Sequence, residues 1–212
     1  MSINALVSVS RLAFERDDAR LFQNVSFDVQ AGDILQLEGP NGSGKTTIFR
    51  LLTGTLHPCE GEIRYRGTPI RECGDEYLSN VLYLAHQPAV KRVLTPEENL
   101  RFGFTSGRWS RQQIAEVLVR VGLAGYEDVP CYTLSAGQHR RVGLARLLLS
   151  DSPVWYLDEP YTAIDKQGVA FLEQCMLEHS RKGGAVILST HQDIAIESVR
   201  KYRLTPAGRV AA

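Results

Sequence analysis

The chain is 212 residues long, enough for one large domain, and 43% of its residues are hydrophobic, as in ordinary globular proteins. Its 24 Lys and Arg residues balance its 24 Asp and Glu residues, and this zero net charge argues against a broad basic surface for nucleic acid. No apolar run approaches the roughly 18 residues that cross a bilayer, and the N-terminus has no secretion leader, so we expect a cytosolic chain. Scattered cysteines without a C-x-x-C pair predict four free thiols (Cys59, Cys73, Cys131 and Cys175).

Short apolar runs separated by turn residues make up the first part of the chain. Runs of this length and composition predict β-strands, whereas apolar residues at helical spacing predict a helix. We expect strands at residues 6–9, 25–29, 34–37, 62–65 and 81–84, and a helix at 47–53 after a glycine-rich loop.

The middle of the chain is helical in pattern. Thr95 is a typical N-cap residue, Pro96 suits the first helical position, and Glu98 can complete a capping box. Residues 111–121 are amphipathic at the helical period, and a further helix is expected at 136–149.

The strand pattern returns after residue 150. Residues 154–157 and 185–188 are apolar throughout, as in parallel strands that are covered on both faces, and 168–179 predicts a crossover helix between them. The sequence therefore predicts an α/β fold with a single domain. This domain has a core (1–87 and 151–212) interrupted by a helical insertion (about 88–150).

A glycine-rich loop between a predicted strand and a predicted helix matches G-x-x-x-x-G-K-[ST], the P-loop pattern. Its glycines let backbone N–H groups surround phosphate oxygens, Lys45 can reach the β- and γ-phosphates, and the Thr46 hydroxyl can bind Mg²⁺. The alternative is a glycine-rich turn with a solvated lysine. The expected nucleotide-binding residues here are Gly39, Pro40, Asn41, Gly42, Ser43, Gly44, Lys45, Thr46 and Thr47.

Two adjacent carboxylates follow the predicted strand 154–157. Ligands of α/β sheets bind at the carboxyl ends of the strands, so Asp158 is a candidate for holding Mg²⁺ through a water and Glu159 for polarising the attacking water. Alone, such a pair is more often a solvated strand end. Together with an upstream P-loop it indicates nucleoside triphosphate hydrolysis.

A third motif, Leu134-Ser135-Ala136-Gly137-Gln138, precedes an arginine-rich helix that contains His139, Arg140, Arg141 and Arg146. Ser135 can cap that helix, whose N-terminal N–H groups form an anion site; the alternative is a plain helix cap. The motif resembles the LSGGQ signature of ATP-binding cassette (ABC) proteins, with Ala136 in place of the first glycine. That resemblance implies that Ser135, Gly137 and Gln138 bind the γ-phosphate held by a second copy in a head-to-tail dimer.

The resemblance implies a P-loop NTPase fold of ABC type, in which a mixed sheet core has an antiparallel β part and a helical sub-domain. Other elements of the ABC pattern follow in the family's order. Gln87 resembles the Q-loop glutamine, which contacts Mg²⁺ or water and senses the membrane partner. Thr162-Ala163-Ile164-Asp165 resembles the D-loop, which implies that Asp165 lies at the dimer interface, and His191 resembles the switch histidine near the γ-phosphate. Alone, such a glutamine or histidine is more often structural.

The chain departs from the ABC pattern at the residue that stacks on adenine. The usual aromatic position falls on Arg16, with Phe14 two residues earlier. A guanidinium can also stack on a π face, so Arg16 is the expected adenine contact. The preference for ATP over GTP follows from the resemblance alone.

Local strings narrow the resemblance to the ATPases of cytochrome c maturation, the CcmA type. They are Glu15-Arg16-Asp17, Glu38 to Gly42, Ala85-His86-Gln87-Pro88, the LSAGQ segment, and Trp155 to Pro160. The resemblance implies ATP and Mg²⁺ as cofactors, a second copy of the chain, a CcmB-type membrane permease with CcmC- and CcmD-type subunits nearby, and a place on the cytoplasmic face of the bacterial inner membrane. Hydrolysis would then support haem delivery, although the sequence shows no C-x-x-C-H or other haem ligand set.

Three alternatives remain at this level. An ABC ATPase for another substrate, such as a lipid or metabolite, fits the same motifs. A soluble ABC protein acting on nucleic acid or ribosomes usually has two cassettes or a long coiled-coil insertion, and a P-loop kinase would lack the LSAGQ segment and His191. The expected surface for a membrane partner runs from Gln87 to about Phe104, with apolar Val90, Val93, Leu94, Phe102 and Phe104, unless these residues belong to the core of the insertion.

Overall fold

The computed structural model describes residues 5–17, 19–103 and 109–205. A parallel sheet forms its centre, with strand order β6-β7-β8-β3-β9 and every adjacent pair parallel. The three central strands β7, β8 and β3 are apolar and almost wholly buried, as expected of a sheet covered on both faces. The bounds are β3 Ile34–Glu38, β6 Val81–Leu84, β7 Val154–Asp158, β8 Ala185–Ser189 and β9 Arg200–Arg203.

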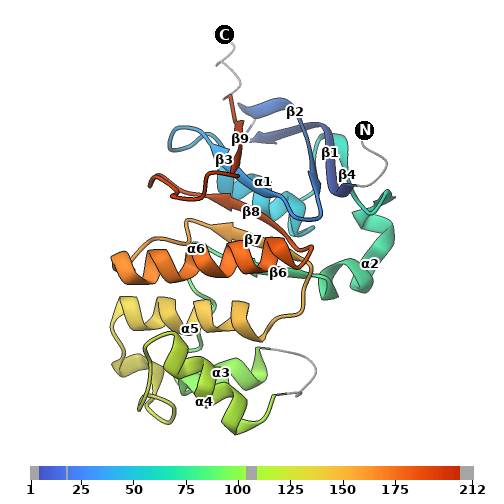
Figure 1. Cartoon of the computed structure of the whole chain (residues 1–212). Helices are drawn as coiled ribbons and strands as arrows, with labels where there is room; N and C mark the ends of the chain where they lie inside the picture. Colours follow the sequence, from blue (N-terminus) through green and yellow to red (C-terminus); the bar gives the residue numbers. More distant parts are fainter. Residues whose placement is uncertain (1–4, 18, 104–108, 206–212) are drawn as a thin grey trace.

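A second, antiparallel sheet packs beside the first through one helix. Its strand order is β2-β1-β4-β5, and helix α1 (Lys45–Leu52) lies between the two sheets (Figure 1). Ile48, Phe49, Leu51 and Leu52 of α1 share one apolar cluster with residues of both sheets, which fixes the helix in place. The bounds are β1 Ala5–Arg16, β2 Ala19–Gln30, β4 Glu60–Tyr65 and β5 Thr68–Pro69.

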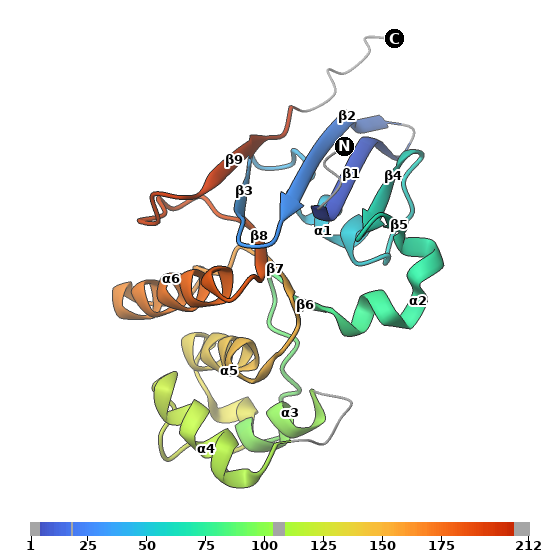
Figure 2. The same ribbon diagram turned by 45° about the vertical axis from the view of Figure 1, so that its right-hand side comes forward.

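Helices cover the other face of the parallel sheet. Helix α6 (Lys166–Arg181) packs there with α5 (Ala136–Leu149), and beyond α5 lie α3 (Pro96–Phe102) and α4 (Arg111–Arg120), as Figure 2 shows. Helix α5 contributes Leu144 and Leu147 to the sheet cluster and other residues to a separate helical cluster, so it is apolar on two sides. This arrangement supports the proposal that 88–150 forms a helical sub-domain of one ATPase domain.

Capping explains where the helices of this sub-domain begin. The expected capping box at α3 is present: Glu98 N donates to Thr95 Oγ1 at 3.2 Å and Thr95 N donates to Glu98 Oε2 at 2.9 Å. Ser110 with Gln113, and Ser135 with Gln138, form the same box at α4 and α5. Three short sequence signals therefore fix three helix starts.

Several elements were not predicted from the sequence. Helix α2 (Ile70–Ser79) is mostly polar, is kinked at Gly74, and has Tyr77 as its buried residue, whose hydroxyl donates to Leu52 O at 2.5 Å. The short strand β5, the polar edge strand β9 and a 3₁₀ turn at Cys131–Thr133 were also missed. These elements depend on tertiary pairing, because their own sequences carry little apolar periodicity.

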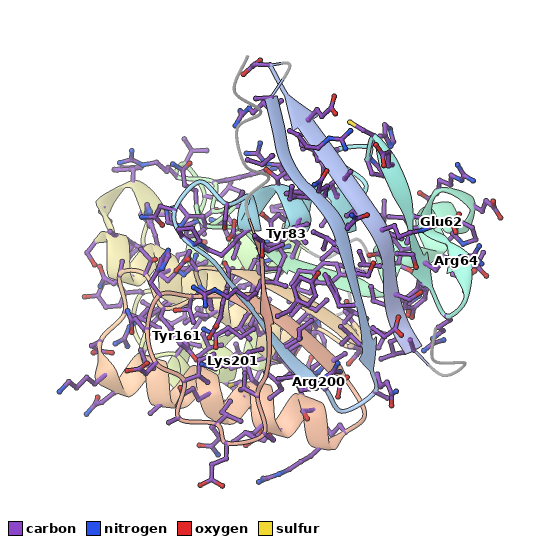
Figure 3. The ribbon with its side chains drawn as sticks, turned by 90° about the horizontal axis from the view of Figure 1, so that it is seen from above. Glu62, Arg64, Tyr83, Tyr161, Arg200 and Lys201 are labelled. Carbon is purple, nitrogen blue, oxygen red and sulfur yellow. The ribbon has the colours of Figure 1, made fainter. Side chains whose placement is uncertain are left out.

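Charged side chains lie on β4, an inner strand of the antiparallel sheet, and on β9, an outer strand of the parallel sheet; Figure 3 labels Glu62, Arg64, Arg200 and Lys201. On β4, Arg64 Nε lies 2.6 Å from Glu62 Oε2; on β9, Lys201 Nζ lies 2.7 Å from Glu38 Oε1 and Arg200 pairs with Asp33. Charges on outer strands discourage pairing with another chain. The four cysteines are free, and within the described ranges no helix has the length and apolar character needed to cross a membrane.

The ring of His179 on α6 stacks on Trp155 of β7, with ring centroids 3.8 Å apart. Burial lowers the pKa of His179 from 6.5 to about 4. The unfolded chain therefore binds more protons than the folded chain between these values, so this contribution to stability is complete above pH 6.5 and declines as the pH falls toward 4.

Replacing His179 by Phe keeps a ring against Trp155 but removes the titration. We expect the free energy of unfolding of the original chain to fall more steeply between pH 6.5 and 4.5 than that of His179→Phe, measured by urea denaturation. Equal slopes in the two proteins would contradict the buried, neutral histidine.

Candidate functional site

A cavity of about 460 Å³ opens at the carboxyl edge of the parallel sheet. The strand order places β8 between β7 and β3, so the loops that follow these three strands meet at one edge. Groups distant in sequence therefore come together in this cavity. Its lining residues are Arg16, Leu21, Asn41, Gly42, Gly44, Lys45, Thr46, Thr47, His86, Asp158, Glu159, Thr162 and His191.

The loop between β3 and α1 forms one wall. Lys45, only 8% exposed, folds back so that Nζ donates to Gly39 O at 2.8 Å and Pro40 O at 3.2 Å. Gly44 has φ +98°, and a Cβ there would lie 2.7 Å from the Phe22 ring, so glycine is required. Helix α1 has no side-chain cap at this residue, which leaves its first N–H groups directed to the loop. The loop is thus a cationic, N–H-rich cradle suited to phosphate oxygens.

Asp158 lies at the end of β7, lines the same cavity and is 1% exposed. Its Oδ1 accepts a hydrogen bond from Ser189 Oγ at 2.8 Å, whereas its Oδ2 has no hydrogen-bond partner. A buried carboxylate oxygen without a donor is costly unless a cation or water faces it. Thr46 lines the same cavity, so a hydroxyl and a carboxylate are available to a hard cation.

Glu159 stands next to Asp158 in a strained backbone conformation, with φ +50°. Its N–H donates to Ser189 O and to Ser189 Oγ, both at 3.1 Å. The side-chain Oε1 is buried without a hydrogen bond, and His191 Nε2 lies 3.5 Å away, beyond good hydrogen-bond distance. The turn therefore aims a carboxylate, unshielded by donors, into the cavity beside an imidazole.

The β1–β2 hairpin closes the other end of the cavity. Arg16 and Leu21 line it, as the sequence predicted for Arg16. Phe14 is instead used in packing, because its ring stacks on Phe22 at 6.3 Å between centroids. The hairpin thus offers a guanidinium and a leucine side chain, but not Phe14, to a ligand.

Several predicted site residues lie outside the cavity lining. Gly39, Pro40 and Ser43 belong to the loop but do not line the cavity, and Gln87 is exposed. Ser135 caps α5 through its bond from Gln138 N, at 3.2 Å, and Asp165 caps α6 through its bond from Gly168 N, at 2.9 Å. Gly137 of the signature segment lies close to the D-loop segment, since a Cβ at residue 137 would lie 3.1 Å from Ala163 O. The structure thus brings the signature segment close to Ala163 of the D-loop; of these two segments only Thr162 lines the chain's own cavity.

Sequence reasoning missed other residues of the site. Leu21, His86 and Thr162 line the cavity, and Ser189 holds both Asp158 and Glu159. His86 precedes the predicted Gln87 directly, and a pattern cannot tell which of two neighbours in a bend faces the cavity. Ser189 follows the expected strand 185–188, which was a usable signal. Among the described residues, no cluster of three or more His, Cys, Asp or Glu side chains could hold a metal on its own.

Comparisons with known proteins agree with this geometry. A family model described as ABC transporter matches residues 22–162. The cytochrome c biogenesis ATP-binding export protein CcmA of Shewanella sp. (strain MR-4) is 49% identical over 206 residues, which cover 96% of this chain and 95% of that protein. The protein of the same name from Escherichia coli (strain UTI89 / UPEC) is 46% identical, with 96% and 98% covered.

Solved structures share the fold. A putative ABC transporter ATP-binding protein from Pyrococcus furiosus has a TM-score of 0.80 at 26% identity, covering 93% of this chain and 96% of that one. A dimeric ATP-binding cassette described in a post-hydrolysis state with ADP and Pi has a TM-score of 0.81 at 23% identity, with 94% of both chains covered. The predicted fold and family are confirmed: the chain belongs to the ABC transporter family and, within it, to the cytochrome c biogenesis ATP-binding export proteins of the CcmA type.

Proposed function

We propose that this chain binds and hydrolyses ATP in the cavity at the carboxyl edge of the sheet. One observation carries the proposal: the buried Lys45 lines the same cavity as Asp158 and Glu159, each of which has a buried carboxylate oxygen without a hydrogen-bond donor. The cationic side suits the triphosphate, and the carboxylate side suits a cation and a water. A ligand with both features is a metal-bound nucleoside triphosphate.

The residues of the cavity fit Mg²⁺ only together with the nucleotide. Thr46 and Asp158 would hold the ion through two oxygen atoms, directly or through water, and phosphate oxygens would supply the remaining ligands, as is usual for Mg²⁺. The ion would supply charge neutralisation of the β- and γ-phosphates. Gln87 is proposed as a further ligand or water contact, which requires its exposed side chain to turn inward.

The chain's own residues divide the work of hydrolysis. Backbone N–H groups of the cavity-lining loop residues (41, 42 and 44–46) and the Lys45 ammonium hold the phosphates, while Arg16 and Leu21 lie where the base would rest. Glu159 takes the proton of the attacking water, since its Oε1 has no donor already bound to it. His191, beside that carboxylate, contacts the γ-phosphate oxygens.

A second copy of the chain completes the site in this proposal. Ser135 is exposed, and Ser135, Gly137, Gln138 and Asp165 do not line their own chain's cavity. Apart from the Gln138 N–H, which Ser135 Oγ caps, the N–H groups at the start of α5 therefore remain available to an anion held by another molecule. We infer a head-to-tail pair in which each cavity meets the signature segment of the other copy, in keeping with the dimeric cassette of the same fold.

The biological role follows from the relatives. Proteins at 46–49% identity over nearly the whole chain are described as ATP-binding export proteins of cytochrome c biogenesis. We propose that hydrolysis here energises haem handling or export for c-type cytochromes, on the cytoplasmic face of the bacterial inner membrane, with a CcmB-type permease and CcmC- and CcmD-type subunits. Another transported substrate, such as a lipid or metabolite, is the competing proposal.

The docking surface for the permease is proposed at the start of the helical sub-domain. Val93 is 80% exposed and Phe102 67% exposed, unusual values for large apolar side chains, whereas Val90 and Leu94 are half-buried. Asn99 fixes this loop, because its Nδ2 donates to Lys91 O at 3.0 Å and its Oδ1 accepts from Lys91 N at 2.7 Å. Phe104, also expected here, lies outside the described residues.

Charge reversal beside this surface tests the docking site. Lys91→Glu with Arg92→Glu should lower recovery of the chain in the membrane fraction while leaving ATP affinity unchanged, because both residues lie outside the cavity. The matched control is Arg181→Glu with Lys182→Glu on the exposed end of α6. Equal membrane recovery for both variants would place the interface elsewhere.

A strain whose only copy carries Glu159→Gln tests the function as a whole. Removing the proton acceptor should lower turnover by roughly 10²–10⁴-fold with ATP binding kept. The strain should then lack mature c-type cytochromes, measured by haem staining of periplasmic and membrane proteins. Normal cytochromes, with the variant shown to be inactive on ATP, would refute the proposed pathway and leave the ATPase assignment intact.

A further inference from the structure

Arg140, in the second turn of α5, is 2% exposed and is among the largest fully buried side chains. Its guanidinium donates to five backbone carbonyl oxygens and to no side chain in the described ranges. The distances are 3.0 Å from Nη1 to Ala85 O, 3.2 Å from Nη1 to His86 O, 3.5 Å from Nη2 to Asp158 O, 2.6 Å from Nη2 to Glu159 O and 3.1 Å from Nε to Pro160 O.

The Arg140 guanidinium directs all of its N–H donors to carbonyl oxygens. Arginine has five N–H donors in a rigid plane; here four of the bonds are 2.6–3.2 Å long, and the fifth, to Asp158 O at 3.5 Å, is weak. A lysine at the same place could donate at most three bonds from one atom and could not bridge carbonyls on opposite sides. Burial lowers the pKa of Arg140 to about 10, which shows the cost of keeping this charge away from water.

The five carbonyls belong to two separate segments. Residues 85–86 follow β6 and lead the chain past α5 toward α3, as Figure 2 shows, so they connect the sheet to the helical sub-domain. Residues 158–160 are the last residue of β7 and the two residues after it, and they contain both carboxylates of the site. Arg140 therefore links the connection to the proposed docking surface with the turn that carries Glu159.

The backbone of Glu159 is held on both sides. Its N–H is bound by Ser189, and its C=O receives the shortest of the Arg140 bonds, at 2.6 Å. This peptide has φ +50°, a strained conformation that persists only when its surroundings impose it. Loss of either partner would let the residue relax toward ordinary φ and turn the carboxylate away from the cavity.

We propose that Arg140 is a positioning residue, which holds Glu159 in its strained, inward conformation and makes that conformation depend on the position of residues 85–86. The inference rests on the proposed role of Glu159 in hydrolysis. Movement of the 85–86 segment by a membrane partner would then change the aim of the carboxylate directly, through one side chain. His86, on the same segment, faces the cavity and would move with it.

A double-mutant cycle tests the proposal on the full chain copurified with its membrane partner. Arg140→Lys should lower kcat for ATP by about 10²-fold, the scale of a misplaced catalytic group, while KM and the affinity for a fluorescent ATP analogue stay unchanged. In the double variant, turnover should be less than about twofold below that of Glu159→Gln alone, because both substitutions remove the same function of Glu159.

Arg146→Lys is the matched control, since Arg146 lies on the same helix, is also poorly solvated, and its Nε has no hydrogen-bond partner. It should leave kcat unchanged. If Arg140→Lys does not accumulate, Arg140→Gln, which places no charge in the interior, enters the same cycle.

The outcomes separate the two ideas. Three results would overturn the positioning role of Arg140. The kcat loss from Arg140→Lys could be as large in the Glu159→Gln protein as in the original chain, or it could come with an equal loss of ATP affinity. The third such result is an equal kcat loss in Arg146→Lys. Full activity of Glu159→Gln itself would instead refute the proposed function on which the inference rests.

Discussion

The site depends on a positive charge that the fold keeps away from water. The Lys45 ammonium is nearly buried, and the acceptors it has are two carbonyl oxygens of its own loop, Gly39 O and Pro40 O. A buried cation without a carboxylate partner is costly, and an arriving anion removes that cost. The loop that holds it requires glycine at residue 44, where Phe22 of the β1–β2 hairpin leaves no space for a side chain. The antiparallel sheet thus contributes to the phosphate cradle from behind.

Hydrogen bonds connect buried polar groups along the carboxyl edge of the parallel sheet. Strand β8 lies between β7 and β3, and its Ser189 bonds both Asp158 and the backbone of Glu159. Arg140 binds the other side of the Glu159 peptide and reaches the segment that leaves β6. Nucleotide chemistry, the sheet and the helical sub-domain therefore meet in one hydrogen-bonded network. Such a network can convert movement of one segment into a change in the direction of one carboxylate.

Local signals made much of this predictable. The P-loop, the strand that delivers Asp158 and Glu159, the capping box at Thr95 and the helix cap at Ser135 each depend on a few consecutive residues, and the structure has them at the expected places. Helix α5 begins and ends at the predicted residues for the same reason. The runs 154–157 and 185–188 predicted a parallel sheet, because strands that are apolar throughout are typical of a sheet covered on both faces.

What the sequence could not give depends on tertiary contacts. Strand β9 is polar and forms by pairing with β3. Helix α2 is anchored by the hydrogen bond of the Tyr77 hydroxyl to Leu52 O rather than by an apolar face. The pattern pointed to Gln87, yet His86 faces the cavity, since the bend after β6 decides which neighbour turns inward. Arg140 was visible as one arginine of a basic helix. The role proposed for it depends on hydrogen bonds to five carbonyl oxygens in two segments, and no sequence spacing predicts that these segments meet.

The central claim is that the Lys45 charge creates the nucleotide site, and ligand-induced stabilisation measures it directly. Unfolding temperature is followed against Mg·ATP concentration for the original chain, Lys45→Ala and the exposed control Lys182→Ala. Loss of a charge-assisted bond worth about 1.5–3 kcal/mol should raise the Kd for Mg·ATP fitted to these curves, which is the half-saturating concentration of binding, roughly 10- to 150-fold in Lys45→Ala and leave that of the control unchanged. The same half-saturating concentration in all three proteins would contradict the account.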